Sequence, residues 1–159
     1  MNQFETDVHF LLMAKNLSEH SPCSSRKVGA VLVRPAAEFL ISFGWNAAPE
    51  GSSLCQDPHA GCHRKMIGYK SGEGIEHCPA VHAEQQALLQ AGRKAMTTEG
   101  STMYVWACLP CSKCLGMIIN AGVKRLVHLD RDDYDYLSGI MLVESGLEVR
   151  RIKEEECVL

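Results

Sequence analysis

The fold is decided by the stretch STMYVWACLPCSKCLGMIIN, residues 101–120. Residues 101–107 include threonine, tyrosine, valine and tryptophan, which favour a strand. Residues 111–120 have the composition of a helix, and Gly122 just beyond them is a residue that ends helices. The motif Pro-Cys-Ser-Lys-Cys at 110–114 lies between the two. This order predicts an α/β unit in which two thiols stand at the beginning of a helix.

Strands and helices alternate on both sides of this stretch. Further strands are expected at 27–33, 39–45, 123–129 and 147–152, and further helices at 4–19, 81–91 and 134–145. The first two strands are joined by the turn RPAAE, and their hairpin adds antiparallel strands to a mixed sheet. Residues 46–78 form a long loop, which is usually functional or needs internal support. We expect one domain, residues 1–159, with a frayed acidic tail at about 153–159.

Composition narrows the class of protein. The chain has 159 residues, of which 46% are hydrophobic and 22% charged, which are ordinary values for one globular domain. The formal net charge of −3 argues against non-specific binding to nucleic acid, because no basic excess neutralises phosphates. No apolar run is long enough to span a membrane, and the opening MNQFETDVHF lacks the basic start of a secretory signal. We expect a cytoplasmic protein.

The eight cysteines are a high count. Disulfides are rare in a reducing compartment, so clustered cysteines indicate metal binding or catalysis. Taken alone, Cys111 and Cys114 are compatible with a redox pair, with half of a structural zinc knuckle, or with a catalytic metal site. Cys108 falls on a strand pattern and is expected to pack, whereas Cys157 in the tail is expected to be idle.

The missing ligands lie upstream, in CPAVHAEQQ. His82, Ala83 and Glu84, followed by Pro-Cys-x-x-Cys, match the pattern of zinc nucleobase and nucleoside deaminases. One imidazole and the two thiolates of Cys111 and Cys114 give zinc three ligands and leave one position open for water. Zinc lowers the pKa of that water, and Glu84, which is not a ligand, can carry its proton. The joint pattern favours a catalytic zinc over the redox pair and the knuckle.

The spacing of His82 and Glu84 sets a geometric condition. Residues i and i+2 point to roughly opposite sides in the middle of a helix. At the first turn this condition is relaxed, because the site can sit beyond the end of the helix. Cys111 and Cys114 also begin a helix, where free N–H groups and the helix dipole favour the thiolate form. Two helix N-termini are therefore expected to converge on one zinc ion.

Longer segments carry a family resemblance. They are SRKVGAVLV (25–33), GWNAAPEG (44–51), VHAEQQALL (81–89), GSTMYVWACLPCSKC (100–114) and NAGVKRLVHL (120–129). With them the chain resembles deoxycytidylate (dCMP) deaminases, within the cytidine deaminase-like superfamily, over most of its length. The resemblance implies a three-layer α/β/α sandwich with a mixed, mostly five-stranded sheet, assembled as a homo-oligomer.

The resemblance also implies the reaction. His82, Cys111 and Cys114 would hold zinc. Hydroxide on this zinc would attack C4 of the cytosine ring and ammonia would leave, while Glu84 shuttles protons. The implied substrate is the nucleotide dCMP, and the implied product is dUMP.

Three residues are candidates for contact with the substrate. Asn46 matches the asparagine of the family's Tyr-Asn-Gly stretch, which contacts the sugar. This chain has Trp45-Asn46-Ala47 and so lacks a glycine that gives backbone freedom. Arg26, just before the first strand, is the candidate for the substrate phosphate, and the alternative is a solvated surface arginine. Ala83 is expected to contact the substrate as well.

A second, structural zinc is expected from four cysteines in loops or at element ends, Cys23, Cys55, Cys62 and Cys78. Many dCMP deaminases carry cysteines at corresponding places. Four thiolates can close a tetrahedral structural site, which would order the long loop. His59, His63 or His77 could replace one of the four, and the alternative is that these thiols are simply buried or idle.

Other functions remain open at this stage. The altered stretch around Asn46 leaves room for another aminated nucleotide, nucleoside or base. A polynucleotide deaminase acting on tRNA conflicts with the net charge of −3 and the lack of a basic stripe. A non-catalytic, zinc-stabilised module conflicts with Glu84, which has no structural duty at a zinc.

Overall fold

The computed structural model describes residues 1–55, 61–70 and 73–158, and within them five strands form one sheet in the order β2-β1-β3-β4-β5. The strands are β1 (Gly29–Arg34), β2 (Phe39–Trp45), β3 (Thr102–Val105), β4 (Arg125–Leu129) and β5 (Glu148–Ile152). Strand β1 is antiparallel to β2 and to β3, whereas β3, β4 and β5 are parallel. The predicted mixed sheet is confirmed.

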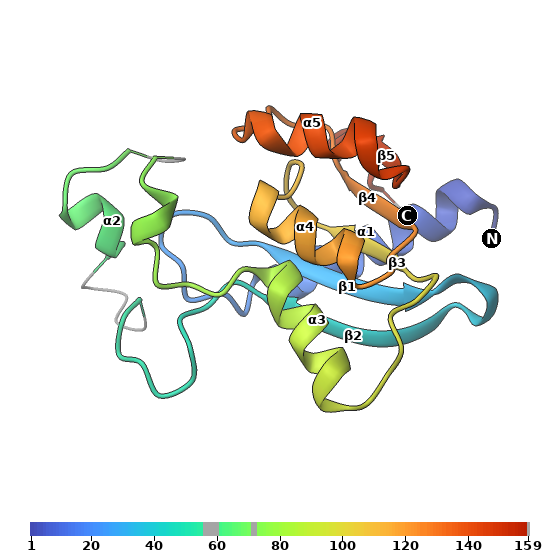
Figure 1. The fold of residues 1–159 in the computed structure, drawn as a ribbon, viewed down its shortest axis with the longest axis horizontal. Coiled ribbons are helices and arrows are strands. Elements are labelled where there is room, and N and C mark those ends of the chain that lie inside the picture. Colours follow the sequence, from blue (N-terminus) through green and yellow to red (C-terminus); the bar gives the residue numbers. More distant parts are fainter. Residues whose placement is uncertain (56–60, 71–72, 159) are drawn as a thin grey trace.

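Helices cover both faces of this sheet (Figure 1). The helices of the described residues are α1 (Gln3–Ser18), α2 (His63–Met66), α3 (Ala83–Arg93), α4 (Ser112–Asn120) and α5 (Tyr136–Ser145). Helices α3, α4 and α5 lie on one face and α1 lies on the other. This arrangement is the expected three-layer α/β/α sandwich. In the part of the chain that the structure describes, no helix is long and apolar enough to cross a membrane.

Alternation along β1 divides the core in two. Ala30 and Leu32 belong to the cluster on the α3 and α4 side, whereas Val31 and Val33 pack on the α1 side. Successive side chains of a strand point to opposite faces, so a central strand that is covered on both sides needs an unbroken apolar run. Residues 30–33, AVLV, supply that run.

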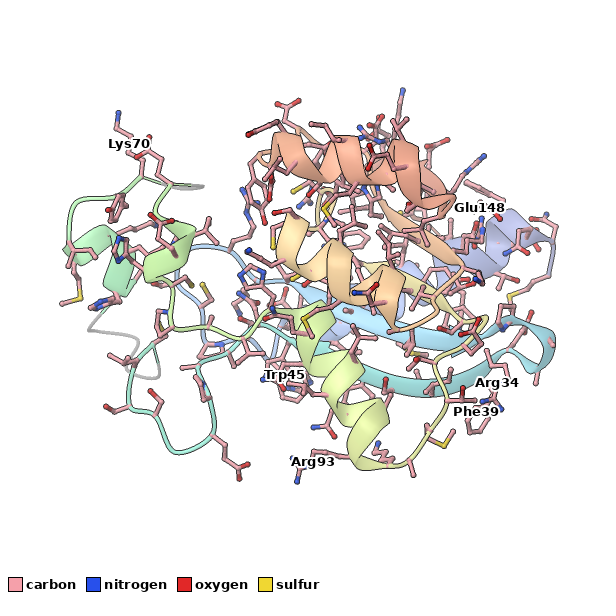
Figure 2. The ribbon with its side chains drawn as sticks, in the orientation of Figure 1. Arg34, Phe39, Trp45, Lys70, Arg93 and Glu148 are labelled. Atoms are coloured by element: carbon pink, nitrogen blue, oxygen red, sulfur yellow. The ribbon has the colours of Figure 1, made fainter. Side chains whose placement is uncertain are left out.

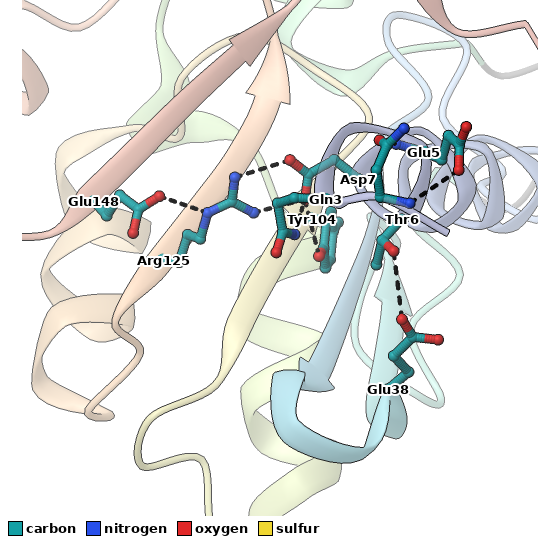
Figure 3. A network of polar contacts seen from close by, with 9 residues as sticks. Gln3, Glu5, Thr6, Asp7, Glu38, Tyr104, Arg125 and Glu148 are labelled. Atoms are coloured by element: carbon teal, nitrogen blue, oxygen red, sulfur yellow. Dashed lines mark hydrogen bonds and ion pairs between the residues drawn. The ribbon is translucent and has the colours of Figure 1, made fainter.

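An ion-pair network fastens α1 to the sheet (Figure 3). Asp7 of α1 accepts two hydrogen bonds from the guanidinium of Arg125 in β4, at 2.6 and 2.8 Å. Asp7 also accepts a hydrogen bond from the Tyr104 hydroxyl of β3, at 3.2 Å. Arg125 donates through Nε to Glu148 of β5, at 2.7 Å. The buried Asp7 carboxylate is thus compensated, as a charge inside a protein has to be.

The predicted loop at 46–78 contains more structure than expected. Ala47 pairs with Val81 in an isolated bridge, and both α2 and the short 3-10 helix η2 (Ile75–His77) lie within this stretch. We call residues 61–70 and 73–78 the α2 lobe. The lobe projects beyond one end of the sheet, and Lys70 on it lies at the opposite side of the molecule from Glu148 (Figures 1 and 2).

The prediction of a frayed C-terminal tail is wrong for the tail residues that the structure describes. Residues Glu154–Glu156 form a 3-10 helix, η3, and Cys157 is buried in the cluster that packs against α1. Most residues of the tail KEEECVL are charged, so the sequence does not indicate that Cys157 packs in the core. Cys157 is therefore a packing residue and not an idle thiol.

Helix α3 approaches β2 very closely at Gly44. A Cβ atom added to Gly44 would stand 2.5 Å from the carbonyl oxygen of Ala83 and 2.6 Å from the Cβ of Gln86. Glycine is the one residue that leaves room for this approach. The contact sets the height of the first turn of α3 above the sheet.

The substitution Gly44→Ala is expected to lower the free energy of unfolding by about 1–3 kcal/mol, because α3 has to move away from β2. Gly92→Ala on the same helix meets no atom within 4 Å and should be neutral or stabilising. Urea unfolding of both variants measures the difference. Equal stabilities of the two variants would contradict the prediction.

Candidate active site

Three metal-binding side chains meet where α3 and α4 begin. His82 directly precedes α3, Cys111 directly precedes α4, and Cys114 lies in the first turn of α4. The Nδ1 atom of His82 is 3.6 Å from Sγ of Cys111 and 3.3 Å from Sγ of Cys114. Within the described ranges, this is the only group in which three such ligand atoms lie within 4.8 Å of one another. The structure thus brings together two helix N-termini and three ligands.

The spacing of these atoms suits a tetrahedral zinc ion. Typical zinc–sulfur and zinc–nitrogen bonds at a tetrahedral angle place the two ligand atoms about 3.6 Å apart. Hydrogen bonds with Cys114 and His82 lower the pKa of the Cys111 thiol to about 4, and the hydrogen bond with Cys111 raises the pKa of Cys114. Two adjacent thiolates repel each other, and a divalent cation removes that repulsion. The donor set therefore fits zinc.

Glu84 shares the pocket with His82 and Ala83. It is the second residue of α3, so both side chains reach the space beyond the helix end despite their i, i+2 spacing. Burial raises the pKa of the Glu84 carboxyl group, and the charge of His82 opposes that rise. A raised pKa suits a group that accepts and releases protons near neutral pH. Ala83 is fully buried and lines the same pocket.

We call residues 106–111, between β3 and α4, the cysteine loop. The segment between β4 and α5 holds this loop in place. Asp135 accepts a hydrogen bond from the Ser112 backbone N–H at 2.7 Å, and Asp133 accepts one from the Leu109 N–H at 3.2 Å. Burial alone would raise the pKa of Asp135, but the hydrogen bonds from Ser112 hold it below its ordinary value. The Asp135 carboxylate also caps α5 through the N–H of Leu137. Neither aspartate was predicted from the sequence, although an aspartate directly before a helix is a recognisable capping signal.

Two candidate substrate residues, Asn46 and Arg26, lie in the wall of the pocket. The Asn46 side chain accepts a hydrogen bond from the Val28 N–H at 2.8 Å and donates one to the Arg26 carbonyl at 2.8 Å. Asn46 thereby fastens the segment before β1 to the end of β2. Arg26 is exposed, and its guanidinium lies over the ring of Tyr134, 5.5 Å from the ring centroid.

Tyr134 and Arg64, which were not predicted from the sequence, line the pocket as well. Tyr134 follows β4, and Arg64 comes from the α2 lobe. Both residues lie outside any motif with a known spacing, so the sequence contains no direct signal for them. Burial raises the pKa of the Tyr134 hydroxyl, and the charges of Cys111 and Glu84 add to that rise. The hydroxyl therefore stays protonated and can donate a hydrogen bond.

The four remaining loop cysteines lie outside the group formed by His82, Cys111 and Cys114. Cys23 and Cys78 line it directly. Burial raises the pKa of the Cys55 thiol, and the nearby thiols of Cys78, Cys23 and Cys62 add to the rise. Among the described residues, no three of these sulfur atoms lie within 4.8 Å of one another. The four thiols are thus neighbours but are less tightly grouped than His82, Cys111 and Cys114.

The histidines considered as substitutes take separate places. His63 is the first residue of α2. His77 of η2 stacks on the ring of Tyr69, with 5.1 Å between the ring centroids. His59 lies outside the described residues.

The chain is similar to known deaminases. The family described as the cytidine and deoxycytidylate deaminase zinc-binding region matches residues 4–129. The chain is 32% identical over 145 residues to the deoxycytidylate deaminase of Schizosaccharomyces pombe, covering 91% of this chain and 43% of that protein. It is 34% identical over 133 residues to the deoxycytidylate deaminase of Mycobacterium phage D29, covering 80% of this chain and 97% of the phage protein. The chain spans less than half the length of the yeast relatives, 43% and 46%.

Solved structures share the fold. The apo dCMP deaminase of cyanophage S-TIM5 is 26% identical, with a TM-score of 0.70 over 96% of this chain and 100% of the phage chain. A diaminohydroxyphosphoribosylaminopyrimidine deaminase/reductase from Thermotoga maritima is 22% identical, with a TM-score of 0.67 over 98% of this chain and 39% of that chain. The second likeness concerns the fold alone.

The substitution Asp135→Ala is expected to lower the free energy of unfolding by about 1 kcal/mol, because α4 and α5 each lose a capping acceptor. The first turn of α4 should then hold Cys111 and Cys114 less firmly, so zinc should be retained less well. Thermal unfolding, together with zinc content after dialysis, measures both effects. Asp132→Ala, which removes a neighbouring exposed carboxylate, should change neither property. Identical behaviour of the two variants would contradict the role of Asp135.

Proposed function

The chain belongs to the cytidine and deoxycytidylate deaminase family, and from this premise we propose that it hydrolyses dCMP to dUMP and ammonia. The observation that carries the proposal is the grouping of His82, Cys111 and Cys114 within 4.8 Å, with His82 lining the same pocket as the buried Glu84. The deoxycytidylate deaminases of yeasts and phages among the relatives support dCMP as the substrate.

The proposed chemistry divides between the metal and the chain. His82, Cys111 and Cys114 would hold the zinc ion, which would lower the pKa of a bound water molecule. Glu84 takes a proton from that water and delivers it to the ring nitrogen beside C4. The water oxygen would bond to C4, and Glu84 would then move the remaining proton of that hydroxyl to the amino group, so that the C4–N bond breaks, ammonia leaves and the carbonyl of uracil forms. The raised pKa of Glu84 supports this role, because the group has to be protonated for part of each cycle.

The substrate would lie between the metal site and the segment before β1. Ala83 and Asn46 line the pocket close to Glu84, in keeping with contacts to the base and to the sugar. Asn46 uses one amide hydrogen and one oxygen lone pair on the backbone, which leaves a second hydrogen for a ligand. Arg26 stands at the exposed rim and would meet the 5′-phosphate.

The zinc-loaded protein is expected to release ammonia from dCMP, and Glu84→Gln is expected to reduce kcat by about 10²- to 10⁴-fold without loss of zinc. Glu99→Gln, which removes an exposed carboxylate paired with Lys124 at 3.8 Å, is the matched control and should keep full activity. Ammonia release and zinc content are measured for all three proteins. A panel of cytosine nucleosides, mono- and triphosphates, free bases and tRNA identifies the substrate. Full activity in Glu84→Gln would refute the mechanism.

We further propose a structural zinc held by Cys23, Cys55, Cys62 and Cys78. Burial is the main cause of the raised pKa of the Cys55 thiol, and the smaller contributions from Cys78, Cys23 and Cys62 support this set. Four thiolates close a tetrahedral site with no open position. Such a site would join the segment before β1 to both ends of the α2 lobe.

Metal analysis of the purified chain is expected to find two zinc ions, and Cys55→Ser is expected to remove one of them while ammonia release from dCMP persists at a lower level. Cys157→Ser, which alters a buried cysteine outside the proposed set, should retain both zinc ions. One zinc ion per chain in the unaltered protein would refute the second site.

Assembly and location complete the proposal. We propose a homo-oligomer, because helices α3, α4 and α5 expose large apolar side chains, among them Leu89, Met117, Ile140 and Val143. Exposed apolar surface of this kind marks an interaction face when it is continuous. A reducing compartment such as the cytoplasm suits the enzyme, because its zinc-binding thiols have to stay unoxidised.

A further inference from the structure

Arg64 is a buried cation in the wall of the pocket that contains Glu84. It lies in α2, is 7% exposed, and lines the same pocket as His82 and Arg26. The α2 lobe lies beyond the end of the sheet (Figure 1). Arg64 therefore reaches the pocket from outside the three layers of the sandwich.

The hydrogen bonds of Arg64 do not account for its burial. Its Nη1 donates to the backbone carbonyl of Glu73, whereas its Nε is buried and has no partner among the described residues. Within those residues, no carboxylate lies within 4.0 Å of its guanidinium. A guanidinium has five N–H donors, and a buried charge that lacks an anion is costly.

Arg125 shows how the same fold treats a guanidinium whose task is structural. It lies among Asp7 and Glu148, with hydrogen bonds of 2.6, 2.8 and 2.7 Å to their carboxylates. Two carboxylates thus compensate Arg125, whereas the acceptor that Arg64 has among the described residues is the neutral carbonyl of Glu73. The difference indicates that the anion that compensates Arg64 arrives with a ligand.

A second guanidinium faces the same pocket from a different segment. Arg26 comes from the stretch before β1 and is exposed at the rim, while Arg64 comes from the α2 lobe and is buried. Arginine binds phosphate with paired, charge-assisted hydrogen bonds, and two arginines can share the oxygens of one phosphate group. A pocket with two cations on its wall and Glu84 as its acid–base group suits a base that carries a phosphate.

We propose that Arg64 recognises the 5′-phosphate of the nucleotide substrate together with Arg26, and that it makes the site selective for nucleotides over nucleosides. The proposal rests on the deaminase function above and deepens it. Arg64 would act as a binding and specificity residue, while Arg26 would contact the same phosphate from the rim of the pocket. The long loop then has a function of its own, since it delivers this cation to the pocket.

Two structural roles compete with this proposal and make different predictions. Arg64 could serve only to brace the turn at Glu73, or it could balance the thiolates of Cys62 and Cys78 at the proposed structural zinc. In either case the loss of Arg64 would damage the whole site. Activity on phosphorylated and unphosphorylated substrates would fall alike, and zinc would be lost.

The decisive test compares Arg64→Gln with Lys65→Gln in the zinc-loaded full chain. Both variants lose one positive charge from α2, but Lys65 is exposed. Arg64→Gln is expected to reduce the ratio of kcat/KM for dCMP to kcat/KM for deoxycytidine by about 10- to 100-fold, mainly through KM for dCMP. Lys65→Gln should leave the ratio unchanged. Arg64→Lys keeps the charge and should recover part of the preference.

Two outcomes decide against the role of Arg64. An unchanged ratio in Arg64→Gln overturns the proposal, and so does an equal loss on both substrates accompanied by loss of zinc. If Arg64→Gln does not fold, as judged by circular dichroism, the same ratio measured in Arg64→Lys decides. If the unaltered chain deaminates neither compound, the proposed function fails. Calorimetric titration with dUMP and with deoxyuridine, which needs no turnover, then measures the phosphate preference of each variant separately.

Discussion

The close approach of two helix N-termini is the constraint on which the rest of the structure depends. His82 and Cys111 each precede a helix that packs on the same face of the sheet, and their ligand atoms lie 3.6 Å apart. The approach requires α3 to lie low over β2, which Gly44 permits, and α4 to begin at a fixed point, which Asp135 holds. Sheet order follows from the same need, since β3 has to deliver the cysteine loop beside β1.

The sequence predicted the parts of this site that depend on local chemistry. His82 and Cys111 directly precede their helices and Glu84 lies in the first turn of α3, in a motif whose spacing reflects the demands of a metal. Strand β2 was predicted at 39–45 and is found at Phe39–Trp45, because its apolar run has clear turn residues at one end. Strand β3 is shorter than the predicted 101–107, since its last residues leave the sheet to form the cysteine loop.

The residues that escaped prediction depend on contacts between distant segments. Arg64 and Tyr134 come from different loops, and neither has a neighbour in sequence that would indicate a pocket. Asp135 was readable as a helix cap, but its second hydrogen bond to Ser112 exists only once α4 and α5 pack together. Cys157 shows the converse, because a single apolar residue in a charged tail can find a place in the core.

The proposed structural zinc and the proposed phosphate site would share one framework. Cys23 lies three residues before Arg26, and its sulfur accepts a hydrogen bond from the Arg26 backbone N–H at 3.5 Å. On the other side, Cys62 lies two residues before Arg64, and Cys78 lies four residues before His82. A metal held by these thiols would fix the separation of the two guanidinium groups relative to the catalytic ligands. Cys23, Cys55, Cys62 and Cys78 would then contribute to substrate selectivity without touching the substrate. Arg26 and Arg64 can favour nucleotides over nucleosides only when their guanidinium groups are held at the correct distance for one phosphate.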